Sequence, residues 1–303
     1  MRNRTIIVLG GAGMLGHKVF QTLRGMFPGT LATVWECVKS PPFDRVTLLQ
    51  GEDVMRGVDA LQFDQLAATL RSLRPDFIVN CIGIIKQRPE ATSPIPTITI
   101  NSLLPHRLAE AAAGWGGRVI HFSTDCVFSG RRGGYTETDP SDAEDLYGRT
   151  KYLGEVAAAN SLTLRTSIIG RELTGRKSLL EWFLSQNHKR ICGFEKVIYS
   201  GVTTNHLAEL VGTLIERHPE LSGLYQVASR PISKCELLRL LRDAYKLDVE
   251  IVPDQTEVCD RSLNGDKLRQ AVGYVCPLWP ELVSQLASDE TPYQSWVQPD
   301  ETF

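Results

Sequence analysis

The residues Gly10-Gly11-Ala12-Gly13-Met14-Leu15-Gly16 decide the fold of this 303-residue chain. They stand between an aliphatic run, Thr5 to Leu9, and a helical pattern from His17 to Arg24, which predicts a strand, a tight turn and a helix. Glycines at this spacing permit close approach of the backbone to a pyrophosphate, and the helix N-terminus offers N–H groups to the phosphates. The pattern favours a dinucleotide site over an ordinary structural turn. The predicted cofactor-binding residues of the turn are Gly10, Gly13, Met14, Leu15 and Gly16.

Strands and helical patterns alternate through the rest of the first half of the chain. The predicted strands are Ala32–Val38, Phe77–Cys81 and Arg118–Ser123, and the predicted helices are Phe63–Leu73 and Ser102–Ala113. Alternation of this kind is typical of βαβ units, whose crossovers build a parallel sheet. We therefore predict an α/β protein with a doubly wound parallel sheet of the Rossmann type.

The alternation weakens after a predicted strand at 162–169. Helices are expected near 179–184, 206–217 and 233–245, between short strand candidates at 223–228 and 249–252. Residues 1–165 are expected to form the dinucleotide-binding domain, and residues 166–303 mainly a smaller α/β substrate-binding domain, part of which returns to the sheet. The polar tail from about Ser288 is predicted to be loose.

Composition narrows the class of protein. A net charge of −2 with 42% hydrophobic and 22% charged residues indicates an ordinary globular protein and argues against electrostatic binding of nucleic acid. Seven scattered cysteines without a C-x-x-C pair predict free thiols and no metal site. No stretch approaches the roughly 20 apolar residues of a membrane span, and glycines interrupt the apolar N-terminal stretch where a signal peptide would continue. We expect a cytoplasmic protein with no nucleic-acid or membrane partner.

The end of the second predicted strand bears on the choice of cofactor. A dinucleotide fold usually places an acid there, about 20 residues after the glycines, to hold the adenosine ribose. This chain offers either Glu36 as that acid or Lys39 and Ser40 as partners of a 2′-phosphate. Lys39 at the strand tip favours NADP(H), with NAD(H) as the alternative.

Tyr147 and Lys151 are candidate acid–base residues. They stand four residues apart, so in a helix both project from one face. A neighbouring cation is expected to lower the pKa of the phenol and suit it to proton transfer at a carbonyl oxygen. A Y-x-x-x-K pattern is usually structural, but Thr124 at the end of an earlier predicted strand adds a hydroxyl that can hold the same oxygen.

Together these motifs resemble those of the extended short-chain dehydrogenases/reductases, and within them the dTDP-4-dehydrorhamnose reductase group. The matching pieces span most of residues 1–210 and keep the order of the family. They are 10–16, 74–80, 123–128, 147–151 with 154–155, 164–167 and 201–204.

The resemblance implies that Thr124, Tyr147 and Lys151 form the catalytic triad and that Lys151 also binds the nicotinamide ribose. The further cofactor positions that it implies are Asp59 at the adenine, Ile82 and Gly83 along the cofactor, and Asn101 supporting the active-site helix. The expected reaction is hydride transfer from NAD(P)H to the 4-keto carbon of a nucleotide-linked deoxyhexose, in deoxysugar and polysaccharide-precursor biosynthesis. A homodimer is also implied.

On the substrate side, Asp125 is expected to face the sugar, and Ile168 replaces a tryptophan that stacks near the sugar in the family. Arg261 reaches either the nucleotide diphosphate or a structural salt bridge. Cys37 stands where the rhamnose enzymes carry the ribose-binding acid, and the proline usual before the tyrosine is missing from 143–146. The identity of the sugar therefore stays open. A sugar-nucleotide epimerase or dehydratase and a non-catalytic NADP-binding regulatory subunit remain alternatives.

Structural roles are the preferred interpretation for several other residues. His17 is predicted to be exposed in the first helical turn, and His121 to be a core histidine with both nitrogens satisfied. Trp182 and Phe183 are interpreted as core residues, in preference to residues that line a sugar pocket.

Overall fold

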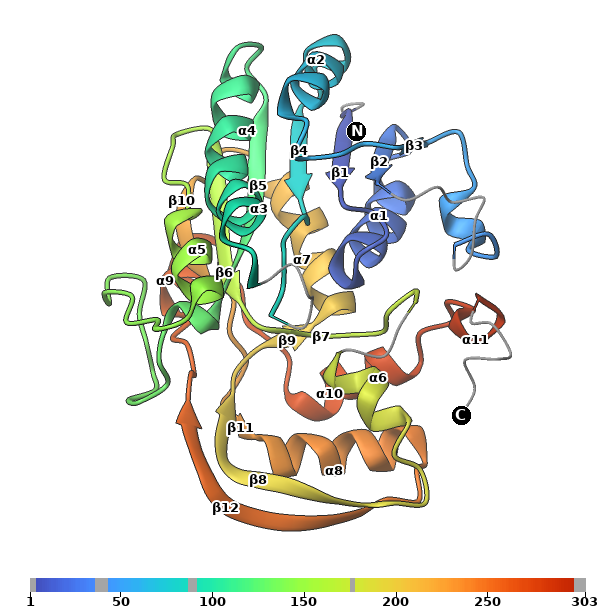
Figure 1. Cartoon of the computed structure of the whole chain (residues 1–303), viewed down its shortest axis with the longest axis vertical. Coiled ribbons are helices and arrows are strands. Elements are labelled where there is room, and N and C mark those ends of the chain that lie inside the picture. The colour runs from blue at the N-terminus through green and yellow to red at the C-terminus, as the bar shows by residue number, and fades with distance from the viewer. Residues whose placement is uncertain (1–3, 36–42, 87–91, 175–177, 297–303) are drawn as a thin grey trace.

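The computed structural model describes residues 4–35, 43–86, 92–174 and 178–296. Its largest feature is a seven-stranded sheet in the order β10-β6-β5-β4-β1-β2-β3, in which every neighbouring pair is parallel (Figure 1). The strands are β1 (Ile6–Leu9), β2 (Thr30–Val34), β3 (Val54–Arg56), β4 (Phe77–Asn80), β5 (Arg118–Thr124), β6 (Ser161–Thr166) and β10 (Gly223–Gln226). The strand order reverses between β1 and β4, so the predicted doubly wound α/β sheet is confirmed.

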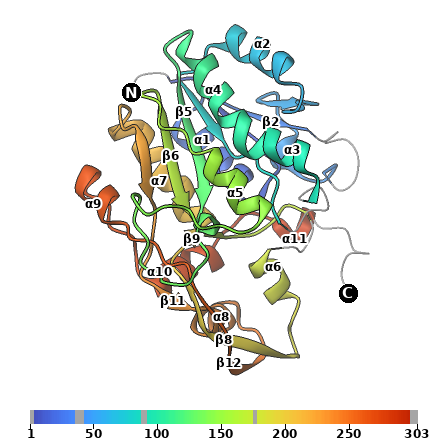
Figure 2. The ribbon, with the colours of Figure 1, turned by 60° about the vertical axis from the view of Figure 1, so that its left-hand side comes forward.

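Helices cover both faces of this sheet (Figure 2). They are α1 (Met14–Met26), α2 (Phe63–Leu73), α3 (Pro94–Ile98), the π-helical segment η3 (Thr99–Leu103), α4 (Leu104–Ala113), α5 (Leu146–Leu153), α7 (Thr204–Arg217) and α9 (Asp266–Val272), with short 3-10 turns η1 (Thr47–Leu49) and η4 (Asp125–Val127). Ile6 and Val8 of β1 face the core shared with α1 and α7, whereas Ile7 and Leu9 face the core shared with α2 and α4. Burial on both faces explains why this strand is apolar throughout instead of alternating.

The smaller unit lies at the other end of the molecule from α2 and α4 (Figure 1). A three-stranded sheet in the order β11-β8-β12 packs there against three helices around one apolar core. The elements are β11 (Ile232–Ser233), β8 (Arg190–Tyr199), β12 (Glu250–Asp260), α6 (Leu179–Leu184), α8 (Lys234–Tyr245) and α10 (Trp279–Ala287). Sequence analysis does not predict β8 and gives only the start of β12. Both strands are partly exposed and rich in charged residues, which weakens the apolar pattern that marks a strand.

Residues beyond 165 are not confined to the smaller unit. After the short parallel pair β7 (Ile168–Ile169) and β9 (Val202–Thr203), the chain returns to the large sheet. Helix α7 packs against α1, and β10 pairs in parallel with β6. The boundary at residue 165 therefore marks the end of the first six strands of the large sheet and does not divide the molecule in space.

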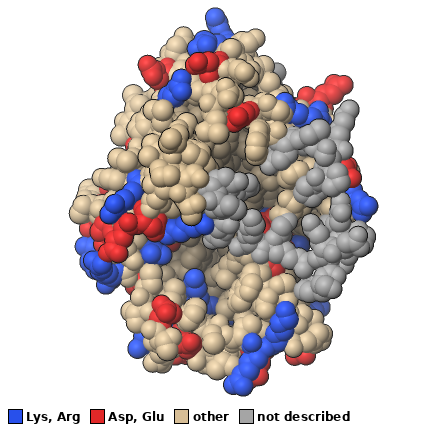
Figure 3. All heavy atoms as spheres, viewed as in Figure 1, with Lys and Arg blue, Asp and Glu red and all other residues tan. Residues whose placement is uncertain are grey.

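Surface charge is mixed on the face that Figure 3 shows. Lys and Arg side chains lie there in small groups beside Asp and Glu side chains. Among the described residues, no helix is both long and apolar enough to cross a bilayer. The mixed charge of this face agrees with the near-neutral charge of the whole chain.

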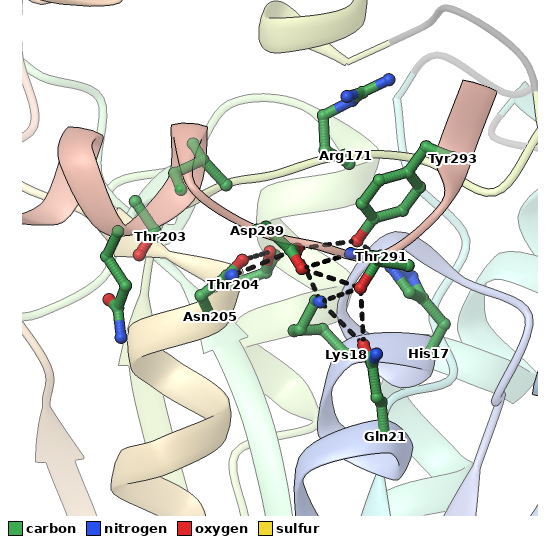
Figure 4. A network of polar contacts seen from close by, with 12 residues as sticks. His17, Lys18, Gln21, Arg171, Thr203, Thr204, Asn205, Asp289, Thr291 and Tyr293 are labelled. Atoms are coloured by element: carbon green, nitrogen blue, oxygen red, sulfur yellow. Dashed lines mark hydrogen bonds and ion pairs between the residues drawn. The ribbon is translucent and has the colours of Figure 1, made fainter. Parts of the chain in front are cut away.

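The prediction of a loose tail from Ser288 is wrong as far as Trp296. Asp289 forms an ion pair with Lys18 of α1 at 2.6 Å, and each side chain is less than 10% exposed (Figure 4). Helix α11 (Tyr293–Trp296) buries both of its terminal aromatic rings in the core of the large sheet. The tail looked polar because its charged and hydroxyl groups bind α1, which composition does not reveal.

The prediction of an exposed His17 is wrong for the same reason. The imidazole is completely buried, and its Nε2 lies 2.9 Å from the hydroxyl of Tyr293. A residue 276 positions later in the chain therefore covers the first turn of α1.

We expect Asp289→Ala to lower the free energy of unfolding by about 3 kcal/mol, because it leaves the Lys18 ammonium buried and unpaired. Urea unfolding measures the change. The matched control is Asp64→Ala, which breaks a pair with Arg107 on the surface, where Asp64 is 98% exposed, and should cost about 0.5 kcal/mol or less. Equal losses in the two variants would contradict a special contribution from the buried pair.

Candidate active site

The glycine turn has the tight geometry that a dinucleotide requires. Gly10 has a φ of +81°, and a Cβ added to Gly16 would lie 2.0 Å from the Gly10 carbonyl oxygen, so only glycine allows α1 to start this close to β1. Gly13 is the N-cap of α1, with Met14 and Leu15 next in the chain. The first N–H groups of a helix have no partner within it. These groups are therefore free to bind the phosphates of a dinucleotide.

A second wall of the predicted cofactor site follows β4. Asn101 of η3 is buried, and its Oδ1 accepts a hydrogen bond from the Ile84 N–H at 2.9 Å while its Nδ2 donates to the Ile84 carbonyl at 2.9 Å. The same Nδ2 lies 3.4 Å from Thr150 Oγ1 on α5. Asn101 thus clamps the loop that carries Ile82 and Gly83 to the helix that carries Lys151. Because protein groups occupy its amide, its part in cofactor binding would be indirect.

Part of the predicted adenosine end of the site lies within the described residues. Asp59 is half-buried after β3, and its Oδ1 accepts a hydrogen bond from the Leu61 N–H at 2.9 Å. Glu36, Cys37, Lys39 and Ser40, on which the choice between NADP(H) and NAD(H) depends, lie outside the described residues.

Thr124 ends β5 at the edge where the parallel strands finish. Its Oγ1 accepts a hydrogen bond from the Cys126 N–H at 3.1 Å and lies 3.2 Å from Asp125 Oδ1. This side chain caps η4 and is buried together with Asp125. The Thr124 hydroxyl lies close enough to the phenol of Tyr147 to act toward a lower pKa of that group.

Tyr147 stands in the first turn of α5, where Asp145 caps the helix by accepting a hydrogen bond from the Gly148 N–H at 2.8 Å. Burial raises the pKa of Tyr147 well above its usual value, and this outweighs the opposite effect of Thr124. The expected lowering of the pKa by Lys151 is therefore wrong for the cofactor-free protein. The Lys151 Nζ instead donates to the Phe122 carbonyl oxygen of β5 at 2.6 Å.

Lys151 is a buried amine beside a buried imidazole. Burial lowers its pKa to about 8, and the carboxylate of Glu155 acts in the opposite direction. Its Nζ lies 3.3 Å from His121 Nε2, and His121 Nδ1 lies 3.1 Å from Asn80 Nδ2. The prediction that both nitrogens of His121 have partners in the core is confirmed. Because Asn80 Oδ1 accepts from the Ile82 N–H at 3.2 Å, Asn80 Nδ2 is the group that faces Nδ1.

An ion pair beneath the site ties α5 to two strands. Arg165 of β6 donates to both carboxylate oxygens of Glu155, at 2.9 and 2.7 Å, and Ser123 of β5 donates to the same carboxylate at 2.6 Å. Both charged side chains are less than 10% exposed. The motif search singled out Glu155 and Arg165 without indicating that they pair. Their pairing fixes the end of α5 against the strands.

Among the predicted substrate residues, Asp125 directly follows Thr124, and Arg261 lies near Asp125. Burial raises the pKa of Asp125, and the guanidinium of Arg261 acts against this rise. Arg261 donates from Nε to the Phe128 carbonyl at 2.8 Å, and among the described residues it has no carboxylate within ion-pair distance. Ile168 is half-buried in β7. Phe183 is completely buried in the core of the smaller unit as predicted, whereas Trp182 is 38% exposed.

Lys86 is a residue near the site that sequence analysis missed. Its Nζ lies 5.6 Å from the centroid of the Tyr147 ring and 2.7 Å from Asp145 Oδ2. The sequence signal that could have found it is its place shortly after Ile82 and Gly83, in the loop that follows β4. Among the described residues, no group of three or more histidine, cysteine or acidic side chains is arranged to bind a metal ion.

A model of the family described as the RmlD substrate binding domain matches residues 4–271. The chain belongs to this family. The predicted resemblance to extended short-chain dehydrogenases/reductases of the dTDP-4-dehydrorhamnose reductase group is thereby confirmed.

Relatives of this RmlD-family chain are distant. It is 26% identical to dTDP-4-dehydrorhamnose reductase of Escherichia coli (strain K12) over 249 residues, 74% of this chain and 83% of that protein. It is 29% identical to methionine adenosyltransferase 2 subunit beta of Mus musculus over 155 residues, and spans less than half, 42%, of that protein's length. The crystal structure of a Bacillus anthracis dTDP-4-dehydrorhamnose reductase in complex with NADP has a TM-score of 0.75 at 22% identity, covering 93% of this chain and 98% of that one. This structural likeness confirms the fold.

We expect Lys151→Met to raise the free energy of unfolding of the cofactor-free protein at pH 7 by about 1–2 kcal/mol, because it removes a buried cation. The lowered pKa also predicts that the wild type gains stability as the pH rises from 8 to 10.5, since the unfolded chain still binds the proton there. Urea unfolding across this pH range measures both effects. The exposed Lys189→Met is the control and should change neither; a destabilised Lys151→Met would contradict the expectation.

Proposed function

We propose that this protein is an NADP(H)-dependent reductase of a 4-keto nucleotide-activated deoxyhexose. It is an oxidoreductase of the short-chain dehydrogenase/reductase type. The observation that carries the proposal is the position of Thr124, at the end of β5, close to Tyr147, which shares α5 with Lys151. The glycine turn follows β1 at the same carboxyl edge of the parallel sheet. Its family and the E. coli reductase among its relatives support the reaction class.

The residues of the turn fit a dinucleotide. Among the described residues, a Cβ added at Gly13 would meet only the Gly10 carbonyl oxygen, at 3.4 Å, and this part of the chain leaves room for phosphate oxygens beside the N-terminus of α1. The turn and α1 would hold the pyrophosphate, Asp59 the adenine, and Lys151 the nicotinamide ribose. A bound NADPH supplies the hydride.

Within this chain, Tyr147 would supply the proton. Its raised pKa keeps the phenol protonated near neutral pH, which suits a group that donates a proton to a carbonyl oxygen as that oxygen gains charge. The Thr124 hydroxyl would hold the same oxygen beside the phenol. Asp145 and Lys86 fix the first turn of α5 and so the position of Tyr147.

Charge around the site suits a nucleotide-linked substrate. Arg261 keeps its guanidinium without a carboxylate partner in the described part of the chain, and it lies close enough to Asp125 to affect that group's pKa. We assign Arg261 to the diphosphate, Asp125 to sugar hydroxyls and Ile168 to the sugar face.

NADP(H) is proposed as the preferred cofactor and NAD(H) as the alternative. The B. anthracis neighbour is in complex with NADP, whereas a Bordetella bronchiseptica neighbour, WbmH, at 16% identity, is in complex with NAD⁺. Because the proposed substrate is a nucleotide-activated sugar, we place the reaction in polysaccharide-precursor biosynthesis. We place it in the cytoplasm. A regulatory subunit is the second candidate function, because one relative is a subunit beta of methionine adenosyltransferase 2.

The first experiment is a titration of the purified protein with NADPH, NADP, NADH and NAD, followed by a panel of dTDP-, UDP- and GDP-linked 4-keto sugars with absorbance at 340 nm. We expect tighter binding of NADPH than of NADH and stoichiometric loss of NADPH absorbance with one sugar class. Turnover without net absorbance change would favour an epimerase. Binding without turnover on any sugar would favour the regulatory subunit.

The Tyr147→Phe variant tests the catalytic assignment on the substrate found in that panel. It should lower kcat at least about 100-fold, the usual contribution of a positioned acid, and leave NADPH affinity nearly unchanged. The control is Tyr152→Phe on the same helix, whose side chain is 42% exposed. Full activity of Tyr147→Phe would remove Tyr147 from the mechanism.

We also propose a homodimer through the helices that carry the site. Large apolar side chains are exposed on α3, η3 and α5, which pack together: Ile95, Ile98, Leu103, Tyr152 and Leu153. Figure 2 shows α3 and α5 side by side on one face of the molecule. Clustered exposed apolar side chains are typical of a protein interface.

We expect Leu153→Asp, at a side chain 62% exposed, to convert a dimer to a monomer in light scattering, because it buries a charge in the interface. Val275→Asp is the control, since Val275 is 74% exposed but lies outside these helices. A monomeric wild type would contradict the dimer.

A further inference from the structure

The segment Asp289–Trp296, here called the C-terminal strap, binds the first turn of α1 (Figure 4). Lys18 donates from Nζ to Gln21 Oε1 at 2.7 Å and to Thr291 Oγ1 at 2.9 Å, in addition to its ion pair with Asp289. These contacts join the strap to the helix that opens with the glycine turn. The sequence motifs and the proposed chemistry leave them unexplained.

The strap is also fixed from two other sides. Asn205 in the first turn of α7 donates from Nδ2 to Asp289 Oδ2 at 3.1 Å. The Arg171 guanidinium lies 4.7 Å from the centroid of the Tyr293 ring and pairs with Glu181 of α6 at 2.6 Å. Tyr293 is therefore held in place by groups other than the one that it contacts on α1.

That contact is with His17, and its proton positions follow from the partners. His17 Nδ1 lies 2.9 Å from the Gly13 carbonyl oxygen, which can only accept, so Nδ1 carries the proton. Burial lowers the pKa of His17 to about 4, so the ring is neutral at pH 7 and Nε2 is an acceptor. The Tyr293 hydroxyl lies 2.9 Å from Nε2 and 3.2 Å from Asp289 Oδ2. Lys18 and Asn205 already donate to that carboxylate oxygen, so we assign the single proton of the phenol to the shorter bond, with Nε2 as acceptor.

The Gly13 carbonyl oxygen accepts two hydrogen bonds from His17, one from the main-chain N–H at 3.0 Å and one from Nδ1 at 2.9 Å, so the side chain adds a second bond to the one that α1 itself makes. The Gly13 oxygen and the Met14 N–H belong to the same planar peptide unit, so a bond that holds one also sets the direction of the other. The Met14 N–H is among the groups at the N-terminus of α1 that have no partner within the helix. The hydrogen bond of His17 thus influences, through one peptide plane, the direction of the Met14 N–H, which would bind phosphate.

We propose that His17 and Tyr293 are positioning residues for the cofactor: the Tyr293 hydroxyl orients the imidazole that fixes the Gly13–Met14 peptide against the dinucleotide pyrophosphate. The inference rests on the proposed binding of NADP(H). It makes the C-terminal strap a part of the cofactor site that touches no cofactor atom.

The test compares NADPH dissociation constants, by fluorescence titration, of the wild type, Tyr293→Phe and a matched control. Tyr293→Phe keeps the ring and removes only the hydroxyl, and we expect about a fivefold weaker affinity, the equivalent of one net hydrogen bond. The control is Tyr274→Phe, which removes a hydroxyl 2.8 Å from His206 Nε2 on α7. It deletes the same kind of Tyr–His bond away from the turn, so it should change affinity less than twofold even if it lowers the melting temperature equally.

A second pair of variants separates positioning from packing. His17→Asn keeps a donor near the place of Nδ1 and should stay within about threefold of the wild type, whereas His17→Phe removes it and should bind at least about fivefold more weakly. Wild-type affinity in Tyr293→Phe, or equal affinities in the two His17 variants, would overturn the inference. Failure of the wild type itself to bind any dinucleotide would instead overturn the proposed function.

Discussion

The arrangement of the site depends on how closely α5 approaches the backbone beside it. A Cβ added to Gly154, which ends this helix, would lie 1.9 Å from the carbonyl oxygen of Asn101 in η3. Only this contact of main chain with main chain allows Ser102 to donate to the Thr150 carbonyl at 2.9 Å and Lys151 to reach β5. The ion pair of Glu155 with Arg165 then fixes the same end of the helix from below. Tyr147 and Lys151 owe their places to packing at the far end of α5.

Burial favours the neutral forms of both groups of the Tyr–Lys pair in the cofactor-free protein. The phenol keeps its proton more strongly than usual and the amine holds its proton less strongly. Spacing alone suggested that the lysine would act on the tyrosine directly. The helix does place both residues on one side, but the amine is long enough to turn toward the Phe122 carbonyl, which is the nearer strong acceptor.

The sequence predicted the parts of the fold whose signals are local. The glycine turn, the alternating strands and helices, and the triad motifs all lie within short windows where periodicity or spacing carries the information. β8 was missed because its charged residues and exposed face erase the apolar pattern. His17 was placed wrongly because its burial depends on Tyr293, and Lys86 was overlooked because a loop lysine has no periodic signal. Short windows of a single sequence do not reveal which distant residue a polar side chain will contact.

The order in which the ribosome delivers these parts has a consequence for folding in the cell. Helix α1 is synthesised early, but β10, which borders β6 at one edge of the large sheet, comes about 200 residues later, and the groups that cover His17 later still. Contacts between such distant residues form slowly, because closing the long loop between them costs conformational entropy before the contacts can stabilise the structure. Until then His17 lacks the side chain that covers it. The growing chain therefore carries an unfinished nucleotide-binding half until residues near 293 have left the ribosome.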